Sequence, residues 1–199
     1  MDDKTDLTLK IIILGSSAVG KTCILNRYFK NEFDNPISTV GIDFQTKFFK
    51  FDGKKIKVNY IDTAGQEKFK AISVNYLKVA NGVILVFDIT KKESFELLGK
   101  WMTDLKENNK KDVRKILIGN KSDLADIREV EKEEVGEFAK GIGCQYFECS
   151  AKSGENITEA LDEIARISYL YIKENEKKLI RSDSFVLSKG GKQEKKKCC

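Results

Sequence analysis

The chain has 199 residues, of which 41% are apolar and 34% charged, with a formal net charge of +5 at pH 7. This size and apolar content allow one packed domain with short appendages. The last 27 residues hold nine Lys or Arg and four Asp or Glu, so the rest of the chain is electrically balanced. The positive charge is therefore concentrated at the C-terminus. This distribution of charge argues against a nucleic-acid-binding surface on the globular part.

The N-terminus and the cysteines indicate a cytosolic protein. The first residues are acidic, and the apolar run Ile11–Leu14 is far shorter than the core of a signal peptide. No run approaches the roughly 20 apolar residues that span a bilayer. Cys23, Cys144 and Cys149 stand among apolar neighbours, as reduced buried thiols do, and their spacing predicts neither zinc nor disulfides.

Apolar, β-branched runs alternate with helical patterns, and continuously apolar runs such as Val83–Phe87 indicate strands buried on both faces. Two runs joined by Asp52-Gly53 indicate an antiparallel hairpin. We therefore expect a doubly wound α/β domain: a six-stranded, mostly parallel sheet with one antiparallel edge strand and helices on both faces. The expected strands are 8–14, 44–51, 56–62, 83–89, 115–119 and 145–149; the expected helices are 21–30, 92–108, 131–141 and 155–172, with a shorter turn near 69–78.

The first predicted strand ends in Gly-Ser-Ser-Ala-Val-Gly-Lys-Thr at residues 15–22, the pattern G-x-x-x-x-G-K-[ST] of a phosphate-binding loop. Glycine lets such a loop bend around a di- or triphosphate, and the N–H groups of the loop and helix N-terminus point at the anion. Lys21 adds positive charge, and the Thr22 hydroxyl is placed to bind Mg²⁺. The alternative is a strand–helix turn that binds nothing. The residues expected at the phosphates are Ser17, Ala18, Val19, Gly20, Lys21 and Thr22.

The segment 31–43 contains Thr39 and neither Lys nor Arg. The Thr39 hydroxyl would complete the Mg²⁺ shell only while a γ-phosphate is present, which predicts a loop ordered in one nucleotide state. Without an arginine here, we expect slow hydrolysis, on the order of 10⁻⁴–10⁻³ s⁻¹, accelerated roughly 10³–10⁵-fold by a partner.

Asp62-Thr63-Ala64-Gly65-Gln66-Glu67 follows another predicted strand. The Asp62 carboxylate is placed to hold Mg²⁺ opposite Thr22, and the Gly65 N–H to reach a terminal phosphate. The Gln66 amide both donates and accepts, as a group that orients an attacking water must. A strand end with turn-forming residues is the alternative interpretation.

Asn120-Lys121-Ser122-Asp123 follows the strand at 115–119. The Asp123 carboxylate can accept from N1–H and the 2-amino group of guanine, whereas adenine would leave it unsatisfied at a cost of about 1–3 kcal/mol. The Lys121 stem can lie along the base, and Asn120 can tie neighbouring loops. After the last strand, the Ala151 N–H in Cys149-Ser150-Ala151-Lys152 can read guanine O6. A helix-capping loop and a Ser cap are the respective alternatives.

In this order the segments resemble the small GTPases of the Ras superfamily, and among them the Rab family. The match covers about Leu9 to Ile172 and the C-terminus. The resemblance implies a P-loop GTPase domain that hydrolyses GTP with Mg²⁺ as cofactor and recruits effectors to membranes in vesicle traffic. The segments most similar to Rabs are Gly41-Ile42-Asp43-Phe44, Ala64-Gly65-Gln66-Glu67-Lys68-Phe69 and Val86-Phe87-Asp88-Ile89-Thr90.

The resemblance also implies roles and partners. Gln66 is the catalytic residue. The implied guanine pocket is Asn120, Lys121, Asp123, Ser150, Ala151, Lys152 and Cys23, the implied metal ligands are Thr22, Thr39 and Asp62, and the implied effector-facing residues are Ile42, Phe44, Ile61 and Tyr76. The implied partners are an exchange factor, a GTPase-activating protein, effectors, an escort protein or GDP-dissociation inhibitor, and a geranylgeranyl transferase. They would act on a monomer that cycles between cytosol and the cytoplasmic face of an intracellular membrane.

Three features depart from the Rab pattern. The stretch from Phe33 to Thr39 is one residue shorter than expected, and Ile61 stands where Rabs usually have Trp. The third is Tyr76-Leu77-Lys78-Val79-Ala80, which matches the usual segment only in part. All three bear on partner recognition and leave the nucleotide pocket intact, so the choice of effectors does not carry over.

The chain divides into a flexible N-terminus at 1–6, a GTPase domain at 7–172 and a flexible tail at 173–199, which ends in Lys195-Lys196-Lys197-Cys198-Cys199. The resemblance implies geranylgeranylation of Cys198 and Cys199. A second lipid chain strengthens an otherwise marginal membrane attachment, and each nearby lysine adds about 1 kcal/mol against an anionic leaflet.

Two other functions stay open from the residues alone. One is a nucleotide-binding module that does not hydrolyse GTP and acts only as a scaffold. The other is an ATP-using P-loop enzyme such as a small kinase, against which Asp123 counts.

Overall fold

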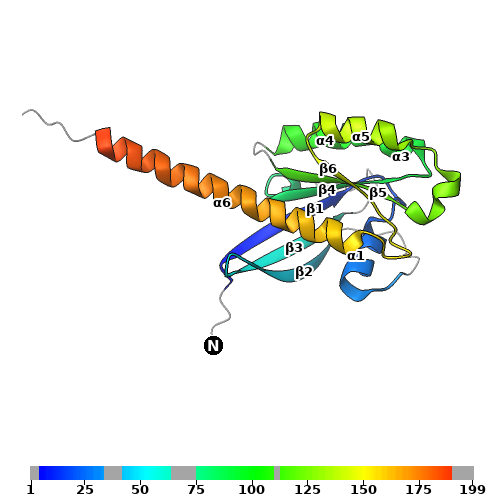
Figure 1. Cartoon of the computed structure of the whole chain (residues 1–199), viewed down its shortest axis with the longest axis horizontal. Helices are drawn as coiled ribbons and strands as arrows, with labels where there is room; N and C mark the ends of the chain where they lie inside the picture. The colour runs from blue at the N-terminus through cyan, green and yellow to red at the C-terminus, as the bar shows by residue number, and fades with distance from the viewer. Residues whose placement is uncertain (1–4, 34–41, 64–74, 110–112, 190–199) are drawn as a thin grey trace, which may run out of the picture.

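The computed structural model describes residues 5–33, 42–63, 75–109 and 113–189. Six strands form one sheet in the order β2-β3-β1-β4-β5-β6, and each neighbouring pair is parallel except β2 and β3 (Figure 1). This is the predicted sheet with its single antiparallel edge strand. The strands are β1 (Leu7–Leu14), β2 (Ile42–Phe51), β3 (Lys54–Thr63), β4 (Gly82–Asp88), β5 (Arg114–Asn120) and β6 (Gln145–Glu148).

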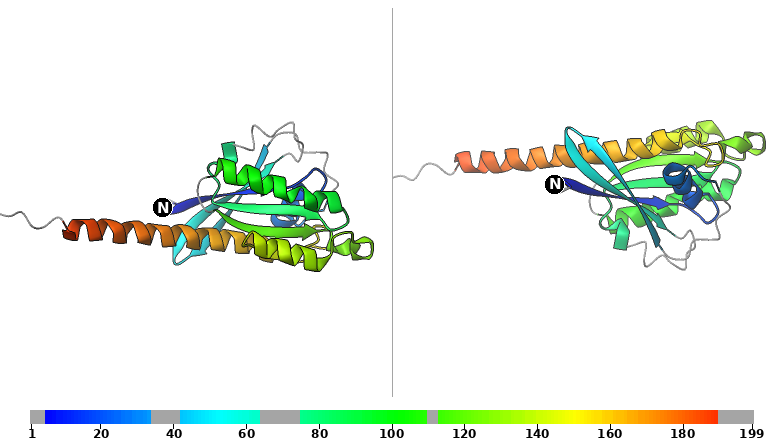
Figure 2. Two further views of the ribbon diagram at one scale, coloured as in Figure 1. Left: turned by 90° about the horizontal axis from the view of Figure 1, so that it is seen from above. Right: turned by 90° about the horizontal axis from the view of Figure 1, so that it is seen from below.

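Helices cover both faces of the sheet (Figures 1 and 2). In β1, Leu9 and Ile11 face a core shared with α1 and α6, whereas Ile12 and Leu14 face a core shared with α3, α4 and α5. The strands are therefore buried on both faces, and every residue of β4 is buried. The helices are α1 (Lys21–Lys30), α3 (Lys92–Glu96), α4 (Leu98–Asn108), the 3₁₀-helix η2 (Ser122–Ile127), α5 (Lys132–Gly141) and α6 (Ile157–Lys189).

The β2–β3 hairpin turns at the two predicted residues. Asp52 has φ 51° and Gly53 has φ 77°, the positive values that a tight two-residue hairpin turn requires. The Asp52 carboxylate accepts hydrogen bonds from the Tyr169 hydroxyl and the Lys173 ammonium of α6. The turn is thereby attached to the C-terminal helix.

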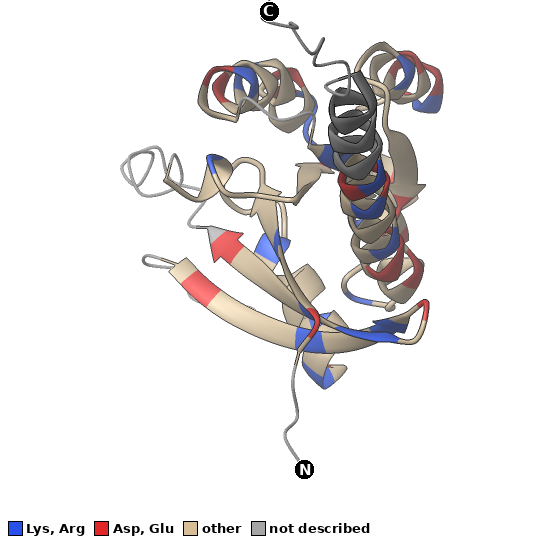
Figure 3. Cartoon of the chain, turned by 90° about the vertical axis from the view of Figure 1, so that its left-hand side faces the viewer, with Lys and Arg blue, Asp and Glu red and all other residues tan. Residues whose placement is uncertain are grey.

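The C-terminal helix is longer than the sequence analysis predicted. The expected helix 155–172 is instead α6, which continues to Lys189 and projects from the body (Figure 1). Residues 157–189 contain neither Gly nor Pro, and Gly190 and Gly191 follow directly. A helix continues through such a stretch without a large apolar face, because polar straight-chain residues are good helix formers. Figure 3 shows Lys and Arg interspersed with Asp and Glu along α6.

A second difference lies in the expected helix 92–108, which is two helices, α3 and α4, that meet at Leu97. Among the described residues, every helix falls short of the length or apolar character that crossing a bilayer demands.

Candidate nucleotide-binding site

Two glycines shape the loop between β1 and α1. Gly15 has φ 152°, and a Cβ there would come within 2.2 Å of the Val86 carbonyl oxygen. Gly20 has φ 95°, and a Cβ there would come within 2.3 Å of Asn120 Nδ2. Between them, Ala18 adopts φ 61°. The glycines are thus required by protein neighbours as well as by the expected phosphates.

Lys21 begins α1, and its side chain folds back along this loop. The buried Nζ donates to the carbonyl oxygens of Gly15 at 2.9 Å and Ser16 at 2.8 Å. Burial lowers the pKa of Lys21 to about 8, and the Asp62 carboxylate acts in the opposite direction. An anionic ligand bound in this loop would therefore favour the protonated, positively charged form of Lys21.

Thr22 and Asp62 meet beside the loop. Thr22 Oγ1 donates to Asp62 Oδ2 at 2.6 Å, which joins the start of α1 to the end of β3. Asp62 is 1% exposed. A hydroxyl and a carboxylate at one place are oxygen donors of the kind that Mg²⁺ prefers, and Mg²⁺ usually adds phosphate oxygens and water to one or two carboxylates. The donor set therefore fits the metal predicted from the sequence.

Asn120, at the end of β5, links two loops. Its Nδ2 donates to the Val19 carbonyl at 2.8 Å, and its Oδ1 accepts from the Ala151 N–H at 3.1 Å. Asn120 is 1% exposed. A single buried amide therefore joins the phosphate loop to the loop after β6, and it shares the N–H that the sequence analysis assigned to guanine O6.

The remaining predicted base-contacting residues gather at the same edge of the sheet. Ser150 Oγ donates to Asp123 Oδ1 at 2.5 Å, and Lys152 Nζ lies 4.0 Å from Asp123 Oδ2. Lys121 Nζ lies 2.5 Å from Asp88 Oδ2 at the end of β4. The structure thus brings residues 120–123 and 150–152 together, because β5 and β6 are adjacent parallel strands.

Comparison with known proteins identifies the family. The Ras family profile matches residues 10–169. Rab-13 of Bos taurus is 45% identical over 162 residues, which cover 81% of this chain and 80% of that protein. Rab-8B of Homo sapiens is 42% identical over 162 residues, covering 81% and 78% respectively. This chain belongs to the Rab small GTPases of the Ras family.

As a Rab protein, the chain binds GTP and GDP, hydrolyses GTP and acts as a switch in vesicle traffic. The predicted family, fold and GTPase activity are confirmed. Nothing supports the alternative of a scaffold that does not hydrolyse its nucleotide.

The other predicted site residues differ in their exposure, and some lie outside the described residues. Ser17 and Ala18 are exposed, and Val19 is buried. Cys23 is half-buried, and burial raises the pKa of its thiol against the influence of Lys121. The predicted residues outside the described part of this Rab are Thr39, Gly65, Gln66, Cys198 and Cys199.

The predicted effector-facing residues divide into exposed and buried ones. Phe44 is 51% exposed, and its ring centroid lies 5.6 Å from that of Tyr76. Ile42 is half-buried. Ile61 is only 1% exposed and belongs to the core beneath β3, so the prediction that it faces a partner requires correction. It pairs with Phe44, but β3 is an inner strand and β2 is the edge.

Sequence reasoning missed two residues at the site. Asp88 is fully buried and lies against Lys121; its position at the end of an apolar strand was a signal that could have identified it. Arg27, on α1, donates to the backbone of Ala151, 124 residues away. No local pattern marks Arg27, since its partners come from a distant loop.

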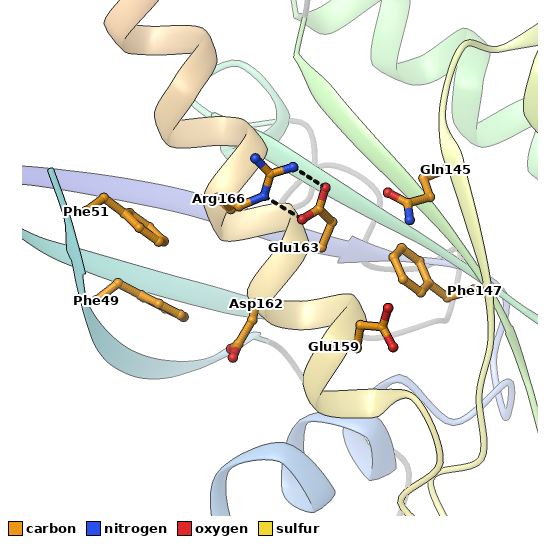
Figure 4. Close-up of a pocket in the computed structure, with 8 residues that line it drawn as sticks. All are labelled: Phe49, Phe51, Gln145, Phe147, Glu159, Asp162, Glu163 and Arg166. Atoms are coloured by element: carbon orange, nitrogen blue, oxygen red, sulfur yellow. Dashed lines mark hydrogen bonds and ion pairs between the residues drawn. The ribbon is translucent and has the colours of Figure 1, made fainter.

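A cavity of about 390 Å³ lies elsewhere, along α6 (Figure 4). Its acidic residues Asp162 and Glu163 are paired with Lys47 and Arg166 respectively. The cavity contains none of the predicted nucleotide-binding residues and is separate from the site described above. It is lined by Phe49, Phe51, Gln145, Phe147, Glu159, Asp162, Glu163 and Arg166.

Proposed function

We propose that this Rab binds its nucleotide together with Mg²⁺ at the loops that follow β1, β3, β5 and β6. The observation that supports this most directly is the Thr22–Asp62 hydrogen bond of 2.6 Å next to the buried Lys21 ammonium. Thr22 and Asp62, with Thr39, would hold the metal, which neutralises charge on the phosphates when bound. Lys21 binds the β- and γ-phosphates, and the backbone of residues 17–20 and Gly65 surrounds them.

The base is selected by the loops after β5 and β6. Asp123 accepts from the two donors on the guanine edge, and Ser150 orients its carboxylate through the 2.5 Å hydrogen bond. Lys121 and Cys23 flank the base, while Ala151 donates to O6 beside Lys152. Asn120 keeps the phosphate loop and the base loop at a constant separation.

Hydrolysis depends on water positioning by Gln66, whose amide both accepts from and donates to the attacking water. Turnover without a partner is slow, because residues 31–43 contain no Arg. A GTPase-activating protein supplies the missing positive charge in the transition state.

The C-terminus attaches the switch to membranes. A geranylgeranyl transferase modifies Cys198 and Cys199, and Lys195–Lys197 add attraction to an anionic leaflet. An exchange factor loads GTP, effectors bind the GTP form at a surface that includes Phe44 and Tyr76, and an escort protein or GDP-dissociation inhibitor extracts the lipidated chain. The protein thus cycles between cytosol and a cytoplasmic membrane face.

Replacing the Asp123 carboxylate tests its proposed role in guanine recognition. Asp123→Asn replaces an acceptor with a group that can donate to the C2 oxygen of xanthine. We expect GDP affinity to fall by at least about tenfold and xanthosine diphosphate affinity to rise, measured by competition with fluorescent GDP.

Asp126→Asn is the matched control, since Asp126 is an exposed residue of the same 3₁₀-helix. It should change neither affinity. If Asp123→Asn keeps the base preference of the natural protein, the assignment of Asp123 is wrong.

A further inference from the structure

Arg27 connects the end of α1 to the base loop through four hydrogen bonds. Its Nε donates to the Ala151 carbonyl at 2.9 Å, and Nη2 donates to the Lys152 carbonyl at 2.7 Å. On the other side, Nη1 donates to the Asn31 carbonyl at 2.9 Å and to Asn31 Oδ1 at 3.0 Å. One guanidinium thus holds two consecutive carbonyls of a loop that follows the last strand.

The loop is built around this side chain. Gly154 has φ 89°, and a Cβ there would contact Arg27 Cδ at 3.5 Å. The Gly154 N–H donates to the Ser150 carbonyl at 2.8 Å, so residues 150–154 close into a turn against the arginine stem. A lysine ammonium can bind two neighbouring carbonyls, as Lys21 does, but the guanidinium presents Nε and Nη2 to the base loop while Nη1 holds Asn31. A single Nζ cannot reproduce this fixed, two-sided arrangement.

Ala151 is therefore restrained on both sides of its Cα. Asn120 Oδ1 accepts from its N–H at 3.1 Å, and Arg27 donates to its carbonyl at 2.9 Å. Fixing both peptide groups fixes the direction of the N–H, which is donated to Asn120 Oδ1 and would reach O6 of guanine as a bond shared between the two acceptors. Asp123 is carried by η2, a separate element from the base loop, and its carboxylate accepts a hydrogen bond from Ser150 of that loop.

We propose that Arg27 is a positioning residue for base recognition: it orients the Ala151 N–H toward O6 of guanine without touching the nucleotide. The inference rests on the proposed function, in which Ala151 reads O6 and Asp123 reads the 2-amino group. Through Arg27, helix α1 would contribute to base selection as well as to phosphate binding at its N-terminus.

Two nucleotide analogues separate the contributions of Ala151 and Asp123. 2-Aminopurine riboside diphosphate lacks O6 and the N1–H but keeps the 2-amino group, whereas inosine diphosphate keeps O6 and the N1–H and lacks the 2-amino group. The loss of the N1–H contact with Asp123 is common to the natural protein and the variant, so a change in preference between them reports the O6 contact. For Arg27→Ala, competition against fluorescent GDP should show the preference for GDP over the 2-aminopurine nucleotide reduced about tenfold. The preference over inosine diphosphate should stay within about twofold, because Asp123 keeps its own support.

Two further variants distinguish positioning of the Ala151 N–H from a general loss of structure at Arg27. Asn31→Gly removes the Oδ1 acceptor, tolerates the φ of 56° at this position and leaves both base-loop bonds, so it should keep both preferences. Arg27→Lys retains the charge and packing stem but should lose the O6 preference like Arg27→Ala, which also covers the case that Arg27→Ala does not fold.

The outcomes are distinct. If the arginine variants weaken both preferences equally, or neither, the positioning role is refuted. If the natural protein itself shows no preference for GDP over either analogue, the proposed base recognition fails instead.

Discussion

Gly20→Ala is the most informative single perturbation of the phosphate loop. The backbone at Gly20 has φ 95°, and the new Cβ would lie 2.3 Å from Asn120 Nδ2. That amide donates to the Val19 carbonyl at 2.8 Å. The substitution therefore adds backbone strain and pushes away the side chain that joins the phosphate loop to the base loop.

The expected cost follows from these two effects. An alanine in the left-handed region costs about 1–2 kcal/mol. Displacing Asn120 leaves a buried Val19 carbonyl without its donor, which costs about 1–3 kcal/mol. Together the free energy of unfolding should fall by about 2–5 kcal/mol.

Gly53→Ala isolates the strain. Gly53 has φ 77°, but a Cβ there meets nothing within 4 Å. Its loss should be about 1–2 kcal/mol, from backbone strain alone. Urea unfolding of the three proteins at one fixed excess of GDP and Mg²⁺ measures both losses, once the change in the nucleotide's own contribution, RT ln(1 + [GDP]/Kd), is subtracted for Gly20→Ala from its measured Kd. GDP affinity should fall for Gly20→Ala only.

A double variant tests the assigned clash. Both atoms that the new Cβ would approach belong to Asn120, so Asn120→Ala makes room for it. Gly20→Ala combined with Asn120→Ala should cost about 1–3 kcal/mol less than the sum of the single changes. Strict additivity, or equal losses for Gly20→Ala and Gly53→Ala, would falsify the reasoning.

Three other predictions concern charge, chemistry and anchoring. Burial lowers the pKa of Lys21 to about 8 in the nucleotide-free protein, so its ammonium loses a proton above that pH. Bound phosphates keep Lys21 protonated, so nucleotide binding above pH 8 takes up a proton. The Kd of GDP should rise about fivefold from pH 8 to 9 and the rise should shrink in Lys21→Arg; an unchanged pH dependence in that variant contradicts the assignment. Gln66→Leu should slow single-turnover GTP hydrolysis at least about tenfold while Gln193→Leu does not, and equal rates in all three proteins would remove Gln66 from the mechanism. After enzymatic prenylation, the full chain should float with anionic vesicles and a chain lacking Cys198 and Cys199 should not; flotation of the shortened chain would exclude these cysteines as the anchor.

The sequence predicted those parts of the fold that depend on local backbone chemistry. The limits of α1, Lys21–Lys30, agree with the prediction because a glycine precedes the helix and its apolar positions have helical spacing. The hairpin turn was predictable at Asp52-Gly53, since few residue pairs tolerate two positive φ values. The end of α6 was predicted wrongly, since scarcity of apolar residues was taken as loss of helix.

What the sequence determined by itself is the nucleotide chemistry: a phosphate loop, a base-reading loop and the family they define can be recognised because each is a contiguous run whose spacing the chemistry requires. Only the tertiary structure decided which partners support them. The contact of Arg27 with Ala151, the approach of Gly15 to Val86 and the burial of Ile61 all arise where distant segments pack together. Such contacts depend on strand order and on which strand lies at the edge, and no short stretch of residues encodes either.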